Sequence, residues 1–542
     1  MTGRHVSPET LERMLGDGGE IAVVDAREHG EYGEGHLFFC VSVPWSRFEL
    51  DLPRRVPNRR VRLVIYDQAD GAVAGAAAEA AEALGYTDVA RLDGGLEGWR
   101  AAGYGIFAGV NVPSKTLGEL VEAAYGTPSL TPEALAERQR RGERVLVLDG
   151  RPWEEYHAWS IPGAMSCPNA ELPYRIGELV PDDETPVVVN CAGRTRSLIG
   201  CEMLRQLGVN NPVYALRNGT MGWRLAGMEL DHGAERRVAT DAPPPDLETR
   251  RRQAQAMAER AGVRRLSAAQ VRDWLDDSGR TTYLLDVRDP REYQRGHLEG
   301  AVSAPGGQLI QATDQWVGVR RARLVLVDDT EVRAAACAFW LAQMDFEVAV
   351  LAGGEAAWWA TESGSTPAPV APSPARRLDV PALVAELAAA EPPWLLDCQP
   401  GMDYRKAHAP QAEWVIRPRL PALAADRDRT RPVRLMGRGE GPADLLAKDL
   451  SALGFSDVAV LAGGVEAWQN AGQPVTASPG TPSDGECLDF LFFVHDRHHG
   501  NLEAAKRYLA WEHGLVAALS PGERAHFRLV PPRRRSPPLR FA

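Results

Sequence analysis

Short apolar runs recur along the chain, separated by longer segments in which polar residues predominate. One kind of run ends in an aspartate. It is too short for a helix and too apolar for a strand with one exposed face, so it predicts a buried β-strand. This run occurs four times, at Ile21–Asp25, Val145–Asp149, Tyr283–Asp286 and Trp394–Asp397.

An acidic residue and a tyrosine follow each of these runs, as Glu31-Tyr32, Glu155-Tyr156, Glu292-Tyr293 and Asp403-Tyr404. Three copies also place an arginine two residues after the aspartate, namely Arg27, Arg151 and Arg288, whereas the fourth copy has Gln399. We interpret Asp149 and Arg151 as a structural pair that fixes the strand rather than as substrate ligands.

A second element closes each copy: an apolar run, a glycine turn and a tryptophan. The turns and tryptophans are Gly94-Gly95 with Trp99, Asn218-Gly219 with Trp223, Gly353-Gly354 with Trp358, and Gly463-Gly464 with Trp468. A further apolar strand and a helical stretch rich in Ala and Leu lie between the opening and the closing elements. Strands that alternate with helices predict parallel sheets with helices on both faces, which is an α/β fold.

The chain has 542 residues, which is enough for three or four domains at about 150 residues each. Proline-rich connectors at 241–245 and 363–374 separate the copies, and 478–484 precedes a tail that is not a fifth copy. The tail contains a predicted helix at about 501–519. The predicted domains are 1–112, 113–240, 255–365 and 374–477, followed by a C-terminal extension of unknown role at 485–542.

The Asp-x-Arg and Glu-Tyr opening, the central strand, loop and helix, and the Gly-Gly and Trp closing together resemble the rhodanese family of sulfurtransferases. The third copy has the most complete opening, from Asp286 through Glu292 and His297 to Ala301. This resemblance implies four tandem rhodanese-like domains of α/β class, each with a reactive loop between the fourth strand and the helix after it.

In the second copy, a thiol lies where a strand ends and a helix begins. The strand Val187–Asn190 leads into Cys191-Ala192-Gly193-Arg194-Thr195-Arg196-Ser197, and the helix is expected from about 197 to 208. Free N–H groups and the positive end of a helix dipole favour anions, so we expect Cys191 to form a thiolate or a persulfide. Arg194 and Arg196 add two positive charges.

A rhodanese-type enzyme would use Cys191 to attack the outer sulfur of a donor, hold that sulfur as a persulfide and release it to an acceptor. The expected donor is thiosulfate or a related persulfide, and the expected acceptor is a thiol or cyanide. Arg194 and Arg196 would bind the anionic donor, and the N–H groups of the loop would hold the terminal sulfur. Ser197 is expected to cap the helix. The loop residues with binding roles are Ala192, Gly193, Thr195 and Ser197.

Two other functions fit the same residues. Cysteine phosphatases and arsenate reductases share a Cys loop, but their spacing is C-x5-R, whereas Cys191 and Arg196 give C-x4-R, a shorter ring that suits one sulfur atom. The second alternative is a redox-sensing or partner-binding scaffold, in which Cys191 registers persulfide or oxidation state with little turnover.

The other three copies lack the thiol. Counting back 28 residues from the second residue of the glycine turn reaches Cys191 in the second copy, Asp67 in the first and Met436 in the fourth. The first has Ala72 and the fourth Gly441 in place of the loop arginine. The third keeps Arg333 but has Asp328 in place of cysteine. We therefore expect these three loops to be catalytically inactive, with scaffolding or substrate-gating roles.

Composition and charge exclude some classes of binding partner. The formal net charge is −12, which argues against nucleic acid as the main partner, and no apolar stretch approaches the ~18 residues of a membrane span. Together with the polar pattern that follows Met1 directly, this predicts a cytoplasmic protein. Seven irregularly spaced cysteines argue against a disulfide framework. No nucleotide-binding motif occurs, so no cofactor is implied. The sequence does not indicate an oligomeric state.

The remaining cysteines and the histidines of the tail lack a site pattern. Cys40, Cys167, Cys201, Cys337, Cys398 and Cys487 are expected to be packing residues, although Cys167 could act as a resolving thiol. His495, His498, His499 and His513 match no zinc spacing, and Arg497 opposes a cation, so we expect a polar turn and no metal. The basic end at 531–538 is expected to be disordered.

Overall fold

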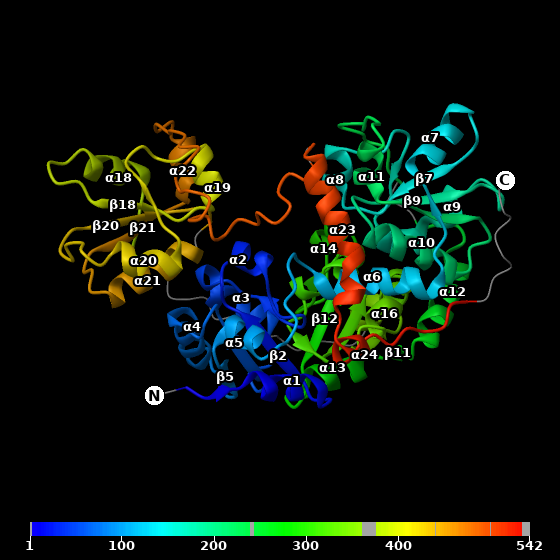
Figure 1. Cartoon of the computed structure of the whole chain (residues 1–542), viewed down its shortest axis with the longest axis horizontal. Coiled ribbons are helices and arrows are strands. Elements are labelled where there is room, and N and C mark those ends of the chain that lie inside the picture. The colour runs from blue at the N-terminus through cyan, green and yellow to red at the C-terminus, as the bar shows by residue number, and fades with distance from the viewer. Residues whose placement is uncertain (1–2, 239–242, 360–374, 440, 499, 534–542) are drawn as a thin grey trace. The chain divides into compact units, whose positions relative to one another are not determined.

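The structure is a computed structural model that describes residues 3–238, 243–359, 375–439, 441–498 and 500–533. The chain forms two compact units (Figure 1). One consists of Met1–Arg13, Ala22–Val110 and Pro367–Phe493, and the other of Met14–Ile21, Asn111–Thr366 and Val494–Ala542. The second and third repeats therefore share a unit with the C-terminal segment. The expected linker at 363–374, the end at 534–542 and part of the 241–245 connector lie outside the described residues.

Each repeat contains its own parallel sheet, which confirms the predicted α/β fold with four domains. In the second repeat the strand order is β6 (Ser129–Leu130), β10 (Val213–Leu216), β9 (Val187–Asn190), β7 (Leu146–Asp149) and β8 (Met165–Ser166). The first repeat has β1 (His5–Val6), β5 (Val89–Leu92), β4 (Arg62–Tyr66), β2 (Ile21–Asp25) and β3 (Val41–Ser42) in the same order. The third has β11 (Arg264–Leu266), β16 (Glu347–Leu351), β15 (Arg323–Val327), β12 (Thr282–Asp286) and β13 (Val302–Ser303), and β14 (Val319–Arg320) precedes β15. The fourth has β17 (Arg377–Leu378), β21 (Val458–Leu461), β20 (Val433–Met436), β18 (Trp394–Asp397) and β19 (Glu413–Trp414).

Helices connect the strands of every repeat. The first repeat has α1 (Pro8–Gly16), α2 (His29–Glu34), α3 (Phe48–Arg55), α4 (Ala72–Ala83) and α5 (Gly95–Ala101), and the second has α6 (Val112–Tyr125), α7 (Pro132–Arg140), α8 (Trp153–Ala158), α9 (Leu172–Leu179), α10 (Thr195–Leu207) and α11 (Gly219–Leu225). The third has α12 (Leu247–Arg260), α13 (Ala268–Asp276), α14 (Pro290–Arg295), α15 (Gly306–Gln311), α16 (Val332–Ala342) and α17 (Gly354–Trp359). The fourth has α18 (Val380–Leu387), α19 (Gly401–Lys406), α20 (Leu420–Leu423), α21 (Gly441–Ala452) and α22 (Gly464–Asn470). The extension forms α23 (Leu502–Ala518) and α24 (Pro521–Ala525), and short 3-10 turns are η1 (Trp45–Arg47), η2 (Asn169–Glu171), η3 (Thr313–Gln315) and η4 (Arg417–Arg419).

The strand β9, which leads to Cys191, is buried along its whole length. Its three valines favour an extended backbone and pack on both faces of the sheet. Helix α10, which follows the loop, is also buried almost all round, since α6, α9 and α12 pack against it. The reactive loop is therefore carried by two elements that are fixed on every side.

The aspartate that ends the opening strand is held by the residue two positions later, as predicted. In the second repeat, Arg151 donates to both oxygens of Asp149 at 2.8 and 2.7 Å and to the carbonyl of Trp159 at 2.6 Å. Both side chains are fully buried. The pair thus ties the end of β7 to the chain after α8, which fixes one wall of the loop region.

The fourth repeat makes the same connection without a charge. Gln399 donates to Asp397 at 2.9 Å and to the carbonyl of Ala407 at 3.0 Å. Burial raises the pKa of Asp397 to about 7. The neutral amide of Gln399 opposes this rise only weakly, because it carries no charge. Glu466 raises the pKa further.

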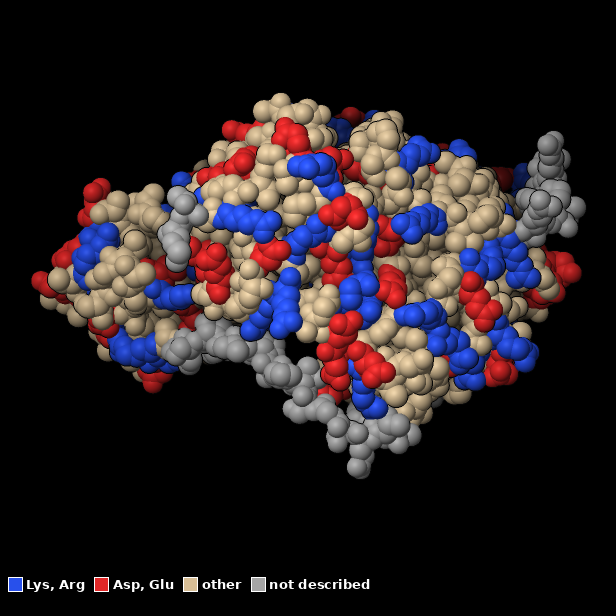
Figure 2. Space-filling view, turned by 90° about the horizontal axis from the view of Figure 1, so that it is seen from below, with Lys and Arg blue, Asp and Glu red and all other residues tan. Residues whose placement is uncertain are grey.

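None of the described helices is long and apolar enough to cross a membrane. The face drawn in Figure 2 shows basic and acidic side chains next to one another rather than in separate patches. That mixture matches the moderate net charge of the sequence.

Gln399→Arg is expected to reduce the pH dependence of stability in the fourth repeat. The folded-state pKa of Asp397 lies above the ordinary value of 3.8, so this carboxyl group binds a proton on folding. Its contribution to stability is present below about pH 4 and is lost as the pH rises through about 7. A guanidinium group at position 399 should lower that pKa and remove much of the loss.

The measurement is hydrogen exchange of peptides covering β18 between pH 5 and 8, corrected for the intrinsic exchange rate. Gln469→Arg, which adds the same charge at an exposed position of the same repeat, is the control. Equal pH dependence in Gln399→Arg and in the control would contradict the expectation.

Candidate active site around Cys191

The thiol of Cys191 lies between β9 and α10 in the second repeat. Asn190 is the last residue of β9 and Thr195 the first of α10, so residues 191–194 form the connecting loop. Ser197 donates its hydroxyl hydrogen to the sulfur of Cys191, with an oxygen to sulfur distance of 3.0 Å. The thiol is shielded from solvent, since Cys191 is only 1% exposed.

The predicted role of Ser197 as the helix cap is wrong. Helix α10 begins at Thr195, Arg194 occupies the N-cap position, and Ser197 lies within the first turn. The tight loop starts the helix earlier than the sequence pattern suggested. The hydroxyl of Ser197 consequently faces the end of β9 and contacts the thiol instead of capping.

The glycine turn that closes each repeat packs directly against the backbone of the loop. Gly219 has a positive φ of 54°, and a Cβ there would lie 2.2 Å from the carbonyl oxygen of Cys191. The next residue, Thr220, donates its N–H to that same oxygen at 2.8 Å. The other repeats show the same close approach. A Cβ added to Gly95 would lie 2.4 Å from the carbonyl oxygen of Asp67, one added to Gly354 2.6 Å from that of Asp328, and one added to Gly464 2.0 Å from that of Gly437. Only glycine fits, which explains why the motif recurs.

Arg194 is buried and shared between two carboxylates of α6. It donates to the two oxygens of Glu119 at 2.7 and 2.9 Å and also contacts Glu122. Burial would lower the pKa of Arg194, but the bonds to Glu119 raise it above its usual value. The same burial raises the pKa of Glu119, and Arg194 opposes that effect.

Arg196 points to a different set of partners. It donates to both oxygens of Glu155, at 2.7 and 2.8 Å, and to Gln308 of the third repeat at 3.1 Å. Burial would lower its pKa, but the charge of Glu155 raises it. Glu155 belongs to the Glu-Tyr pair of the opening motif, so this motif residue holds the loop arginine.

The C-terminal helix α23 covers the loop. It packs against α6 and α11 within the same unit (Figure 1). Glu512 of α23 accepts hydrogen bonds from Lys115 at 3.2 Å and from Thr195 of the loop at 3.4 Å, and Tyr508 donates to it at 3.2 Å. Lys115 also contacts the hydroxyl of Tyr508. Glu512 is 1% exposed.

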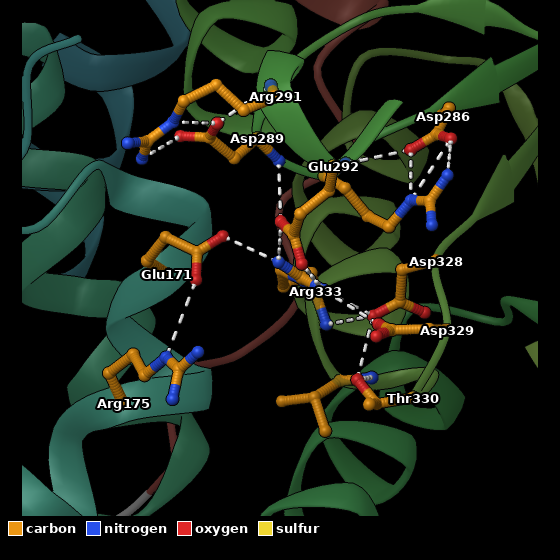
Figure 3. Close-up of polar contacts among 12 residues, drawn as sticks. Glu171, Arg175, Asp286, Asp289, Arg291, Glu292, Asp328, Asp329, Thr330 and Arg333 are labelled. Carbon is orange, nitrogen blue, oxygen red and sulfur yellow. Dashed lines mark hydrogen bonds and ion pairs between the residues drawn. The ribbon is translucent and has the colours of Figure 1, made fainter. Parts of the chain in front are cut away.

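The loop of the third repeat is filled by its own carboxylate (Figure 3). Asp328 accepts N–H hydrogens from Glu331 at 2.6 Å and from Arg333 at 3.1 Å, and the hydroxyl of Thr330 at 3.0 Å. Burial raises the pKa of Asp328 to about 6, against the effect of Arg333. The side chain of Arg333 is itself bound by Glu292, Asp329 and Glu171, the last of these from the second repeat.

The first repeat shows the same arrangement. The carboxylate of Asp67 accepts N–H hydrogens from Ala69 at 3.1 Å, from Gly71 at 2.9 Å and from Ala74 at 2.9 Å. The N–H groups that could hold an anion in the second repeat are thus occupied by an aspartate in the first and third.

In the fourth repeat, the residue assigned to the position of Cys191 was wrong. Asp397 pairs with Met436, just as Asp149 pairs with Asn190, so Met436 corresponds to Asn190. The residue equivalent to Cys191 is Gly437, and the one five positions later is Pro442 rather than Gly441. This loop is one residue closer to its glycine turn, so the fixed count of 28 residues placed it incorrectly. The fourth repeat still has no thiol there.

A family model for the rhodanese-like domain matches residues 7–102, 131–226, 267–361 and 380–471. The chain belongs to the rhodanese family. The four matched segments correspond to the four α/β domains described above.

This rhodanese is similar to proteins of known name. A crystal structure of thiosulfate sulfurtransferase from Pseudomonas aeruginosa is 42% identical, with a TM-score of 0.89 over 97% of this chain and 99% of that one. A sulfurtransferase of Allochromatium vinosum is 33% identical over 18% of this chain and 89% of its own length. An HTH-type transcriptional regulator of Mycobacterium tuberculosis is 35% identical over 27% of this chain and 67% of its own length. The family match and the two sulfurtransferases support sulfurtransferase activity, and the chain is a transferase of the rhodanese type.

All the predicted site residues of this rhodanese lie together in one buried segment. Cys191, Ala192, Gly193, Arg194, Thr195, Arg196 and Ser197 are each less than a tenth exposed. No sequence pattern indicated the residues that surround them, which are Lys115, Glu119 and Glu122 on α6, Gln308 on α15, and Tyr508 and Glu512 on α23. Of the carboxylates that bind the two arginines, Glu155 alone belonged to a recognised motif.

The other cysteines are free thiols in packing positions. Cys40, Cys167, Cys201, Cys337 and Cys487 are buried and Cys398 is partly buried. Burial raises the pKa of Cys167 and of Cys337 well above the usual value. Both thiols are therefore held in the neutral, unreactive form.

The histidines of the tail take separate positions. His495 contacts Asp496 at 3.1 Å, whereas His498 stacks on Trp159 with ring centres 6.1 Å apart. Burial lowers the pKa of His498 to about 3. His499 lies outside the described residues. Among the described residues, the group of side chains close enough to share a metal ion is His5, Asp70 and Asp93 of the first repeat.

Gly219→Ala is expected to destabilise the second repeat and to displace the carbonyl of Cys191. A methyl group would overlap backbone rather than a flexible side chain, so the loss should exceed the cost of about 1–2 kcal/mol for a left-handed residue alone. Gly142→Ala, at a φ of 69° with no atom within 4 Å, is the control for that cost. Thermal unfolding would show the difference, and equal losses would contradict the close approach.

Proposed function

We propose that this protein moves sulfane sulfur from thiosulfate or a related persulfide donor to a thiol or cyanide acceptor through a persulfide on Cys191. The observation that carries the proposal is the placement of one thiol at a strand end, beside the hydroxyl of Ser197 and at the start of α10. The sequence and structure shared with a thiosulfate sulfurtransferase support the donor.

The first step forms a bond between Cys191 and the outer sulfur of the donor. The thiolate attacks that sulfur, the sulfur–sulfur bond of thiosulfate breaks, and sulfite leaves with the electron pair. Ser197 stabilises the sulfur anion before and after the step by donating a hydrogen bond. In the second step an acceptor attacks the terminal sulfur, and Cys191 leaves as a thiolate.

The backbone N–H groups from Ala192 to Ser197 would hold the terminal sulfur, because successive N–H groups in a tight loop form a concave site for an anion. The carboxylate of Asp328 occupies the corresponding N–H groups of the third repeat, which supports an anion at this position. Arg194 and Arg196 would contribute to donor binding while they remain paired with Glu119 and Glu155. Their charges are thus partly offset before the donor arrives.

Access to the thiol requires a change in its surroundings. Cys191 is 1% exposed, so a donor the size of thiosulfate cannot reach its sulfur while the surrounding residues keep these positions. The catalytic cycle therefore includes movement of residues around the loop. The first, third and fourth repeats act as scaffold, since none offers a thiol at the equivalent position of its described loop.

The closed thiol also favours a second candidate function, a persulfide or redox sensor with little turnover. A sensor needs the thiol to react only after a structural change, whereas an enzyme must open once in every cycle. Steady turnover with thiosulfate, lost in Cys191→Ser, favours the enzyme, and binding or modification without turnover favours the sensor.

Incubation with thiosulfate is expected to add the mass of one sulfur atom per chain, and cyanide is expected to remove it. Intact-mass spectrometry measures both changes. Cys191→Ser should abolish the gain. Cys201→Ser, which removes a fully buried thiol from α10, the helix after the loop, is the control and should keep the gain. A gain that survives in Cys191→Ser would overturn the proposed site.

A further inference from the structure

The two oxygens of the Glu512 carboxylate have different surroundings. Oε1 accepts hydrogens from Lys115, Tyr508 and Thr195 at 3.2 to 3.4 Å. Oε2 is buried, and none of the described residues donates a hydrogen bond to it. A buried acceptor without a donor is costly, so Oε2 is an oxygen that a bound molecule could satisfy.

This free oxygen lies against the reactive loop. A Cβ built on Gly193, the second residue after Cys191, would lie 3.2 Å from Oε2. Gly193 has no side chain, so the carboxylate faces the loop backbone directly. Met221 and Tyr508 are the other close neighbours of this position.

Charged groups of both signs surround the carboxylate. Lys115 and Glu119 face it from α6, Arg194 from the loop and His513 from α23. Arg497 stacks on the ring of Tyr508 at 4.6 Å. Burial would lower the pKa of Lys115, but Tyr508 and Glu512 raise it above the usual value, so Lys115 remains a cation.

We propose that Oε2 of Glu512 accepts the proton of a thiol acceptor, and that the acceptors of this enzyme are neutral thiols. The inference rests on the proposed persulfide chemistry and assigns the acceptor class to it. A thiol is mostly protonated near neutral pH, and only its thiolate attacks efficiently. The unpartnered Oε2 is a hydrogen-bond acceptor placed beside the loop, so it can take the S–H hydrogen of a thiol.

The S–H bond of the acceptor breaks and its proton passes to Oε2, while the acceptor sulfur forms a bond with the terminal sulfur of the Cys191 persulfide. The sulfur–sulfur bond to Cys191 breaks, and Cys191 leaves as a thiolate with the electron pair. The proton on Glu512 then returns to the persulfide product or to water. No external oxidant or reductant takes part.

Single-turnover kinetics of enzyme already loaded with sulfur by thiosulfate test this role. With 2-mercaptoethanol as acceptor, Glu512→Gln should lower the rate about 100-fold, the lower end of general-base effects. With sulfite, which has no S–H proton to lose, the rate should be unchanged or higher. Loss of sulfur mass from the protein reports both reactions.

The pH profile provides a signature that a structural role would not produce. The rate of Glu512→Gln with 2-mercaptoethanol should rise with pH in proportion to the thiolate fraction of this acceptor, whereas the wild-type rate should depend on pH less steeply. Glu503→Gln is the matched control, because Glu503 lies exposed on the same helix and pairs only with Lys506 among the described residues. It should match the wild type with both acceptors.

Equal losses with 2-mercaptoethanol and sulfite, or an unchanged rate with 2-mercaptoethanol, would overturn the role of Glu512. If Glu512→Gln does not load sulfur, Glu512→Asp decides: a slower thiol reaction with an unchanged sulfite reaction supports the proposal, and parallel rates contradict it. Failure of the wild type to load sulfur would instead refute the persulfide chemistry, before any acceptor is added.

Discussion

Backbone N–H groups at the start of a buried helix need an acceptor, and this requirement governs the reactive loops of this protein. In the first and third repeats the acceptor is the carboxylate of Asp67 or Asp328, which follows the central strand directly. In the second repeat the same position holds Cys191. Its sulfur accepts a hydrogen bond from the hydroxyl of Ser197, whereas the aspartates of the other two loops accept backbone N–H groups.

Charge balance around Cys191 differs from what two arginines alone would give. Arg194, Arg196 and Lys115 are matched by Glu119, Glu122, Glu155 and Glu512, all contributed by α6, α8 and α23. Each ion pair offsets the desolvation penalty of burying a cation and fixes the shape of the loop. The loop therefore carries no excess of positive charge from these side chains.

The fold was largely predictable because its signals are local. The Asp-ended strands, the Glu-Tyr pairs and the glycine turns each lie within a few residues, and the structure places all of them as expected. Errors arose where a count replaced geometry, as at Met436, where the loop is one residue shorter, and at Ser197, where the helix begins early. The surroundings of Cys191 were not predictable, since 397 residues separate Lys115 from Glu512 and no periodic pattern links them.

The contact between α23 and the loop also depends on the order in which the chain is synthesised. The ribosome produces Cys191 long before the residues of α23, and domains generally fold as they emerge. The second repeat can therefore fold before α23 exists, and Glu512 reaches Lys115 and Thr195 only after the third and fourth repeats have been made.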